Sequence, residues 1–375
     1  MAIRVLTLFG TRPEVIKLAP VIAALDQRPS DFATINVASG QHLDLVDPFA
    51  RELGIRIDHA LGVGDGARTP LDVLHRAIDA LSALVRCIPA DALLVQGDTT
   101  TALAGALVGA YLRIPVGHVE AGLRSGSVDS PFPEELNRRL ITLAARHHFA
   151  ATPENRAALV AEGVDPESIV VTGNPVVDAV QQILRNGAPT ERVRSLLAAI
   201  GERKLLLLST HRRESFGEVM ASRLRVLGEF VARHEDVALV FPVHPNPEVR
   251  RSAARFLAEQ PRVHLIEPLG YADFVHLMRA AWLIVSDSGG VQEEAPSVGR
   301  PLLVIRDRTE RPEVLRAGFA RLVGESADTL REMLEEALHS LAWFERARSG
   351  ENPFGRGDAG PRIAAALLAL SQAAR

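Results

Sequence analysis

Three carboxylates in the first half of this chain stand where acid–base chemistry could take place. Asp98 and Glu120 each come just after a short apolar run that predicts a buried strand, and Glu134 begins a predicted helix after a proline-bracketed loop. Because parallel strands bring their carboxyl ends to one edge of a sheet, Asp98 and Glu120 are expected at the same edge. Taken alone, Asp98 fits a helix N-cap somewhat better than a functional carboxylate.

Two cations lie just beyond the glycine turn that follows the first apolar run, residues 3–9. Arg12 and Lys17 are therefore predicted at the carboxyl edge of the first strand, where open α/β sheets bind ligands. The basic residues are almost all arginines, and the only lysines are Lys17 and Lys204. A lysine at position 17 hints that a compact ammonium is needed there. Solvated charges on a surface turn are an equally good interpretation of Arg12 and Lys17.

A small-residue turn in the second half has the composition of a phosphate-binding loop. The stretch 287–295, DSGGVQEEA, follows an apolar run and opens a predicted helix. Free backbone N–H groups at a helix N-terminus bind anions, and Gly289 and Gly290 allow close approach. Glu294 would lie about one turn into the helix, where a carboxylate can accept both hydroxyls of a ribose. The alternative is a common glycine-rich turn with no ligand.

The elements that must position these groups alternate between short apolar runs and helical patterns along both halves of the chain. This rhythm predicts an α/β protein with two doubly wound domains and parallel sheets, whose ligand-binding loops face a cleft. We place the first domain at 1–175 and the second at 176–359, with a hinge at Gly173-Asn174-Pro175. The last helix, within 360–375, is expected to pack back on the first domain.

Composition excludes several classes of function. At 375 residues, with 47% hydrophobic and 23% charged residues, the chain is typical of a globular protein with two full cores. A net charge of −4 predicts no nucleic-acid or membrane partner. The single cysteine, the lack of a signal peptide and the absence of an apolar run near ~18 residues favour a cytoplasmic protein. No H-E-x-x-H, G-x-S-x-G or early G-x-G-x-x-G pattern occurs, so neither metal, acyl nor dinucleotide redox chemistry is expected.

Several long motifs, in the same order, resemble those of the bacterial non-hydrolysing UDP-N-acetylglucosamine 2-epimerases. They are FGTRPE at 9–14 with Lys17, GDTTT at 97–101, GHVEAGLR at 117–124, PEELNR at 133–138, HRRES at 211–215, PVH at 242–244, DSGGVQEEA at 287–295 and ERPE at 310–313. The resemblance covers nearly the whole chain. It implies a glycosyltransferase-B-like fold of two Rossmann-like domains, a homodimer, a UDP-sugar substrate and no metal or redox cofactor.

The resemblance also implies a reaction. UDP leaves C1 as the C2 proton is removed, giving a 2-acetamidoglucal, and proton and UDP then return, the proton to the other face. Because the C2 hydrogen is not next to a carbonyl, departure of UDP must be assisted, and protonation of the opposite face needs a second acid. The catalytic residues so implied are Asp98, Glu120, Glu134 and His211, the last near the leaving diphosphate. The substrate-binding residues so implied are Arg12, Lys17, Arg138, His244, Phe274 (by the uracil), Ser288, Gly289, Gly290, Glu294 (at the ribose) and Arg311.

One segment departs from the family. Many members carry Gln-His-Arg-Glu-Met, associated with a second, activating UDP-GlcNAc, where this chain has QHLDL at 41–45 and Pro48 in place of a usual glutamine. Leu43 cannot make the bidentate phosphate contact of an arginine, so we expect weak or no activation.

The alternatives are a hydrolysing epimerase that releases ManNAc and UDP, and the same chemistry on a 2,3-diacetamido uronic acid sugar. A retaining glycosyltransferase and a nucleotide-sugar-binding regulator are disfavoured, since neither needs three carboxylates.

Overall fold

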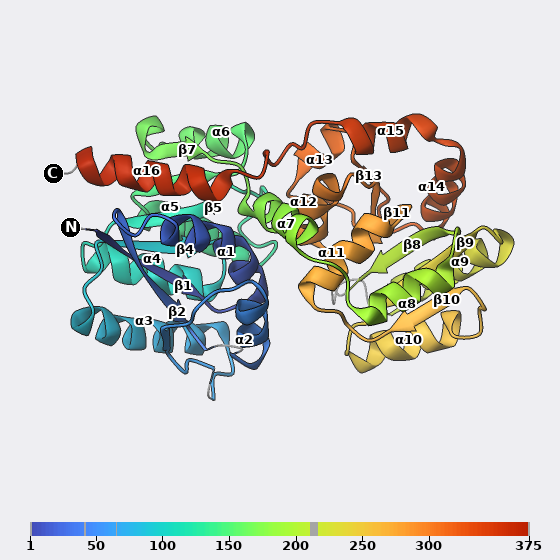
Figure 1. The fold of residues 1–375 in the computed structure, drawn as a ribbon, viewed down its shortest axis with the longest axis horizontal. Coiled ribbons are helices and arrows are strands. Elements are labelled where there is room, and N and C mark those ends of the chain that lie inside the picture. Colours follow the sequence, from blue (N-terminus) through green and yellow to red (C-terminus); the bar gives the residue numbers. More distant parts are fainter. Residues whose placement is uncertain (1, 41–42, 65, 211–216, 374–375) are drawn as a thin grey trace. The chain divides into compact units, whose positions relative to one another are not determined.

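A computed structural model describes residues 2–40, 43–64, 66–210 and 217–373 (Figure 1). The chain divides into two compact units. The first runs to Ala179 and takes in the chain again from Phe354, and the second runs from Val180 to Pro353. The observed divisions lie a few residues from the expected ones at 175/176 and 359/360. The helix at the C-terminus belongs to the first unit.

The first unit is built on a parallel seven-stranded sheet in the order β3-β2-β1-β4-β5-β6-β7. Its strands are β1 (Ile3–Phe9), β2 (Phe32–Ala38), β3 (His59–Ala60), β4 (Ala92–Gln96), β5 (Val116–Ala121), β6 (His147–Ala150) and β7 (Ile169–Val171). Its helices are α1 (Arg12–Asp26), α2 (Leu43–Glu52), α3 (Pro70–Cys87), α4 (Thr100–Tyr111), α5 (Glu134–Ala144), α6 (Pro153–Ala161) and α16 (Ala359–Ala373), with a 3₁₀ turn at Pro166–Ser168.

Two helical layers cover the two faces of this sheet (Figure 1). Helices α1, α2 and α16 share one apolar core with the sheet, and α3, α4 and α5 share another. All five residues of β4 are buried, as expected of a strand covered on both faces. Helix α16 packs closely on α1: a Cβ at Gly360 would lie 2.4 Å from the Pro20 carbonyl oxygen.

The second unit repeats this plan with a parallel six-stranded sheet in the order β10-β9-β8-β11-β12-β13. Its strands are β8 (Lys204–Ser209), β9 (Val237–Pro242), β10 (Val263–Ile266), β11 (Leu283–Ser286), β12 (Leu302–Val304) and β13 (Ala320–Leu322). Helix α7 (Pro175–Asn186) enters this unit, which contains α8 (Glu191–Ile200), α9 (Glu218–Arg233), α10 (Pro247–Leu257), α11 (Tyr271–Ala280), α12 (Gly289–Val298), α13 (Pro312–Arg316), α14 (Ala327–His339) and α15 (Leu341–Ser349).

The predicted pair of α/β domains with parallel sheets is confirmed. Strand order reverses between β1 and β4 in the first unit and between β8 and β11 in the second. In doubly wound sheets, ligands bind at the carboxyl ends of the strands beside this reversal. The loops after β1 and β4, and the start of α12 after β11, are therefore where function is expected.

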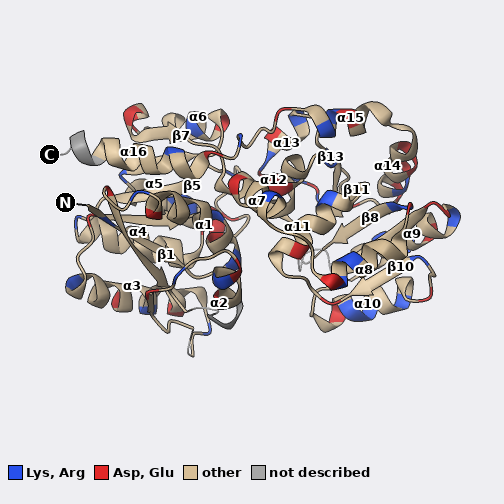
Figure 2. Cartoon of the chain, in the orientation of Figure 1, with Lys and Arg blue, Asp and Glu red and all other residues tan. Residues whose placement is uncertain are grey.

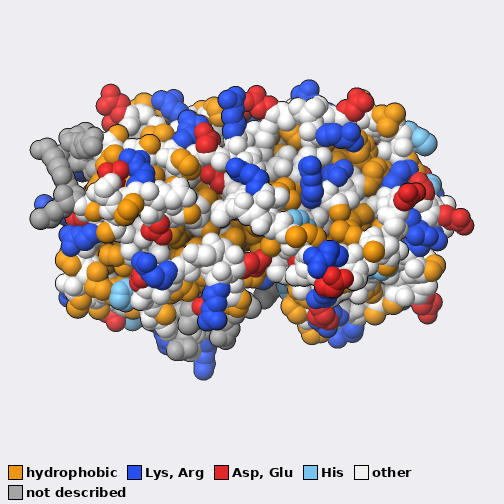
Figure 3. Space-filling model, in the orientation of Figure 1, with side chains coloured by type: hydrophobic (Ala, Val, Ile, Leu, Met, Phe, Trp, Pro, Cys, Tyr) orange, Lys and Arg blue, Asp and Glu red, His pale blue; other side chains and the backbone are white. Residues whose placement is uncertain are grey.

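Charged residues of both signs are interspersed along both units (Figure 2). On the face drawn in Figure 3, basic and acidic side chains alternate with apolar ones and form no continuous basic track. Among the described residues, no helix is both long and apolar enough to span a membrane.

Candidate functional site

Asp98 lies at the strand-order reversal of the first unit, in the turn between β4 and α4. Its carboxylate pairs with Arg138 of α5, whose Nη2 lies 2.6 Å from Oδ2, and its carbonyl accepts a hydrogen bond from the Asn137 amide at 2.9 Å. The alternative of Asp98 as N-cap is wrong. Thr99 caps α4 by accepting the Ala102 N–H, which leaves the Asp98 carboxylate to α5.

Glu120 is delivered by an irregular end of the neighbouring strand β5. It has φ of +65°, and the β5–β6 pairing shifts register at this point. The left-handed conformation is costly for a residue with a side chain. The backbone then passes close to α6, where a Cβ at Gly122 would lie 2.2 Å from the Asn155 carbonyl oxygen. The bend turns the carboxylate of Glu120 inward, where only 7% of its side chain is exposed.

Two side chains hold the Glu120 carboxylate by the same oxygen. Lys17 of α1 forms a buried ion pair with Oε2, and the Asn174 amide donates to Oε2 at 2.9 Å. Lys17, which was expected to bind substrate, is here the counter-ion of Glu120. The ammonium and the amide both favour the ionised form of Glu120.

Glu134 is the first residue of α5 and is half-buried. The next residue, Glu135, has a fully buried side chain and bonds Arg138 at 2.9 Å, Arg139 at 3.2 Å and the Ser125 N–H at 3.0 Å. Arg138 thus bridges two carboxylates, Asp98 and Glu135. Its expected role at substrate is accompanied by a structural one.

The first βα turn places Arg12 at the surface. The Arg12 guanidinium lies 5.2 Å from the centre of the Phe49 ring of α2, within cation–π range. Glu14, two residues on, is fully buried and accepts hydrogen bonds from the Gly10 and Thr11 N–H groups. It also accepts the Thr99 hydroxyl at 2.6 Å, so that it joins the two loops at the strand-order reversal.

Burial raises the pKa of Glu14 from 4.5 to about 7, against the opposing effect of the Thr99, Gly10 and Thr11 hydrogen bonds. A raised pKa means that the folded chain keeps this proton while the unfolded chain releases it. We therefore expect Glu14 to make the protein less stable as pH rises from about 4.5 to 7, by about 3 kcal/mol in total. Urea unfolding of the Glu14→Gln variant across this range should lack that loss. Parallel stability profiles for the two proteins would contradict it.

Sequence reasoning missed Glu14, Glu135, Asn174 and His118. His118 on β5 lies with Nε2 2.7 Å from the Gly97 carbonyl oxygen. Burial lowers the pKa of His118 to about 3, so the ring is neutral and Nε2–H is the donor. The ring thereby fixes the residue before Asp98. Three of these residues lie within the sequence motifs, and Asn174 lies in the predicted hinge. That position alone does not separate a residue that contacts the catalytic candidates from one that only packs in the core.

In the second unit, the N-terminus of α12 is built from Ser288, Gly289 and Gly290 as predicted for this helix start. The Arg311 guanidinium packs against this turn, so that a Cβ at Gly289 would lie 2.8 Å from its Nη1. Arg311 is held by Glu293 at 2.6 Å and by Glu310 at 3.3 Å. A helix N-terminus with a fixed guanidinium beside it has the chemistry needed to bind a phosphate.

Glu310 helps to hold the Arg311 guanidinium at the start of α12. Burial alone would raise the pKa of its carboxyl, but hydrogen bonds from Arg306 and the charges of Arg311 and Arg306 lower it to about 2. Glu310 therefore stays ionised and keeps both guanidiniums in place.

The remaining predicted residues of this unit also lie near strand ends or helix starts. Glu294 of α12 is buried and accepts the Tyr271 hydroxyl at 3.0 Å. Phe274 of α11 is half-buried, and His244 after β9 accepts the Asn246 N–H on Nδ1 at 3.2 Å. His211 lies outside the described residues.

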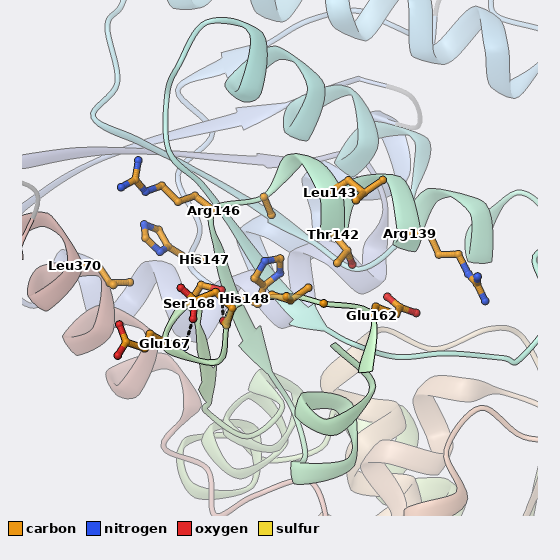
Figure 4. A pocket seen from close by; sticks show the side chains of 14 residues that line it. Arg139, Thr142, Leu143, Arg146, His147, His148, Glu162, Glu167, Ser168 and Leu370 are labelled. Atoms are coloured by element: carbon orange, nitrogen blue, oxygen red, sulfur yellow. Dashed lines mark hydrogen bonds between the residues drawn. The ribbon is translucent and has the colours of Figure 1, made fainter. Parts of the chain in front are cut away.

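A separate pocket of about 730 Å³ opens beside β6 in the first unit (Figure 4). It is bordered by His147 and His148 at the start of that strand, with Arg146 and Glu167 nearby. This is the end of the strand opposite to the one that carries the site. Burial lowers the pKa of His148 to about 4, so its ring is neutral. Among the described residues, no group of three His, Cys, Asp or Glu side chains is arranged to hold a metal ion.

The sequence pattern of one family, UDP-N-acetylglucosamine 2-epimerase, matches residues 23–368. The chain belongs to this family. It is 41% identical to the UDP-N-acetylglucosamine 2-epimerase of Escherichia coli strain K12, over 97% of this chain and 98% of the relative. It is 40% identical to the Bacillus subtilis strain 168 enzyme of the same name, over 98% and 95%.

A solved structure agrees. The crystal structure of UDP-GlcNAc 2-epimerase from Neisseria meningitidis, bound to UDP-GlcNAc, superposes with a TM-score of 0.90 at 36% identity, covering 98% of this chain and 100% of the other. Membership of the 2-epimerase family and the glycosyltransferase-B-like fold, both expected from the motifs, are confirmed.

Proposed function

We propose that this protein interconverts UDP-GlcNAc and UDP-ManNAc without hydrolysing either. The observation that carries the proposal is the set of acidic sites in the first unit, with Asp98 and Glu120 on adjacent strand ends and Glu134 on α5. It is supported by relatives 40% and 41% identical to this chain that are named UDP-N-acetylglucosamine 2-epimerase.

In the proposed reaction, the second unit binds the nucleoside diphosphate. The N–H groups at the start of α12 and Arg311 would stabilise charge on the phosphates as the C1–O bond breaks. Glu294 would accept the ribose hydroxyls and Phe274 would pack by the uracil. His211 would lie near the leaving diphosphate, and His244 after β9 would also contact the substrate.

The first unit supplies the proton chemistry. As UDP leaves with the C1–O electron pair, a carboxylate takes the C2 proton, and the C2–H electron pair forms the C1–C2 double bond of a 2-acetamidoglucal. Return of a proton to the other face of C2 and of UDP to C1 gives the epimer. Asp98, Glu120 and Glu134 are the acid and base candidates, since two faces need two separately placed groups.

Proton NMR in D₂O tests the proposal. UDP-GlcNAc should yield UDP-ManNAc with deuterium at C2 and an intact nucleotide. Free ManNAc with UDP would show a hydrolysing enzyme instead. An unchanged spectrum with UDP-GlcNAc would contradict this substrate, and a 2,3-diacetamido uronic acid UDP-sugar would then be assayed in the same way.

We further propose that the activating effect of a second UDP-GlcNAc is weak or absent. Gln41 and His42 lie outside the described residues, and Pro48 is exposed within α2. The support is chemical: leucine at position 43 offers no donor to a phosphate, whereas arginine offers a bidentate one. Adding trace UDP-GlcNAc to a reaction started from UDP-ManNAc should leave the initial rate within about twofold. Strong acceleration of the wild-type protein would contradict this, and the Leu43→Arg variant tests whether the missing donor is the cause.

We also propose a homodimer that uses the outer surface of α3, α4 and α5. Large apolar side chains on these neighbouring helices are exposed, namely Leu71, Tyr111 and Leu143 at 72%, 87% and 84%. Large exposed apolar side chains on neighbouring helices suit an association surface. Light scattering should give twice the mass of one chain for the wild type and the single-chain mass for Leu143→Glu. A monomeric wild type, or a Leu143→Glu dimer, would contradict the proposed surface.

A further inference from the structure

Asn174 contacts three different parts of the first unit and is almost fully buried. Its side-chain amide donates to Glu120 Oε2 at 2.9 Å, and its Oδ1 accepts the Val176 N–H at 3.1 Å at the start of α7. Its backbone N–H donates to the Phe354 carbonyl oxygen at 2.8 Å.

Both of these backbone partners stand near points where the chain passes from one unit to the other. Helix α7 carries the chain out of the first unit after Ala179, and Phe354 is the first residue after the return. These three hydrogen bonds therefore join an outgoing segment, a returning segment and a carboxylate of the proposed active site.

We infer that Asn174 is a positioning residue for the Glu120 carboxylate. It links this carboxylate by hydrogen bonds to the two segments through which the chain leaves the first unit and returns to it. The inference rests on the proposed function, in which Glu120 is one of the groups that exchange the C2 proton. An amide suits this place because it donates a hydrogen bond at every pH and carries no charge to compete with Lys17.

The same contacts also distinguish the two oxygens of the Glu120 carboxylate. Lys17 and Asn174 both act on Oε2, and a protonated Oε2 would present its hydrogen to two donors. Protonation at Oε2 is therefore disfavoured. The Asn174 amide and the Lys17 ammonium together restrain the Glu120 side chain.

Asn174→Asp tests the inference with the smallest change of shape. The substituted side chain keeps an oxygen for the Val176 N–H but replaces the donor to Glu120 with a carboxylate. A like charge beside a carboxylate favours its protonated form, so the titration midpoint of Glu120 should rise by about one pH unit or more. The corresponding limb of the kcat/KM profile should move up by the same amount, whether Glu120 acts as base or as acid. If Glu120 is the base, activity below that limb falls about tenfold per unit.

The midpoint is read directly by ¹³C NMR of protein labelled at the glutamate carboxyl carbon, with Glu120→Gln to assign the resonance. Asn352→Asp is the matched control, because Asn352 lies in the second unit, where its amide donates to the Ser297 hydroxyl at 2.9 Å. It should leave the Glu120 midpoint in place. Asn174→Ser, which keeps a helix-capping oxygen but does not reach Glu120, should raise the midpoint by less than Asn174→Asp, and it serves if the aspartate variant fails to fold.

An unmoved Glu120 midpoint in a folded Asn174 variant, or an equal shift in Asn352→Asp, would overturn the inference. The NMR titration separates this failure from failure of the proposed function. A wild-type protein with no deuterium exchange at C2 would refute the reaction and still report whether Asn174 governs Glu120.

Discussion

Glu120→Gln should reduce deuterium incorporation at C2 by roughly 10³-fold while UDP binding stays within about twofold. Glutamine keeps the size of the side chain and an oxygen for the Asn174 amide, although it removes the charge that pairs with Lys17. What it lacks is a site that can take or give a proton. UDP is expected to bind to the second unit, at the start of α12, and a calorimetric titration with UDP should show little change.

The control for this variant is Glu167→Gln, an exposed carboxylate of the same unit in the 3₁₀ turn before β7. It should retain wild-type exchange. Glu120→Gln with more than a tenth of the wild-type rate would remove Glu120 from the proton chemistry. Loss of UDP binding together with activity would point instead to a general structural defect, which a thermal melt would reveal.

The fold was predictable because its determinants are local. Fully buried parallel strands such as β4 are continuous apolar runs, and proline or threonine at helix starts shows where α1 and α6 begin. The position of Asp98 and Glu120 at one sheet edge follows from that alternation alone. Family membership was predictable for a different reason, because the motifs are long and occur in the same order.

The partners of the catalytic candidates were not predictable, because they depend on distances between residues far apart in sequence. Asn174 is 54 positions from Glu120, and Lys17 is 103 positions from it. A lysine after a glycine turn suggests a phosphate ligand equally well. Only the inward bend at Glu120, which has no signature in residue type, makes that lysine the counter-ion of a carboxylate.

Arg138→Met is expected to destabilise the first unit by about 3–5 kcal/mol at pH 8 and to abolish measurable epimerisation. The Arg138 side chain is 7% exposed and bonds Asp98 at 2.6 Å and Glu135 at 2.9 Å. Methionine fills much of the same volume but leaves two carboxylates with reduced compensation, and one of them is fully buried.

Arg139 provides the matched control on the same helix. It bonds the other oxygen of Glu135 at 3.2 Å, but its side chain is 42% exposed. Solvent screening makes such a pair worth little, so Arg139→Met should unfold at nearly the wild-type urea concentration and keep its activity. Equal losses of stability in the two variants would mean that the net charge of α5 matters and the Arg138 contact with Asp98 and Glu135 does not. A large loss in Arg138→Met alone would show that one buried guanidinium holds Asp98 at the strand end where proton transfer is proposed.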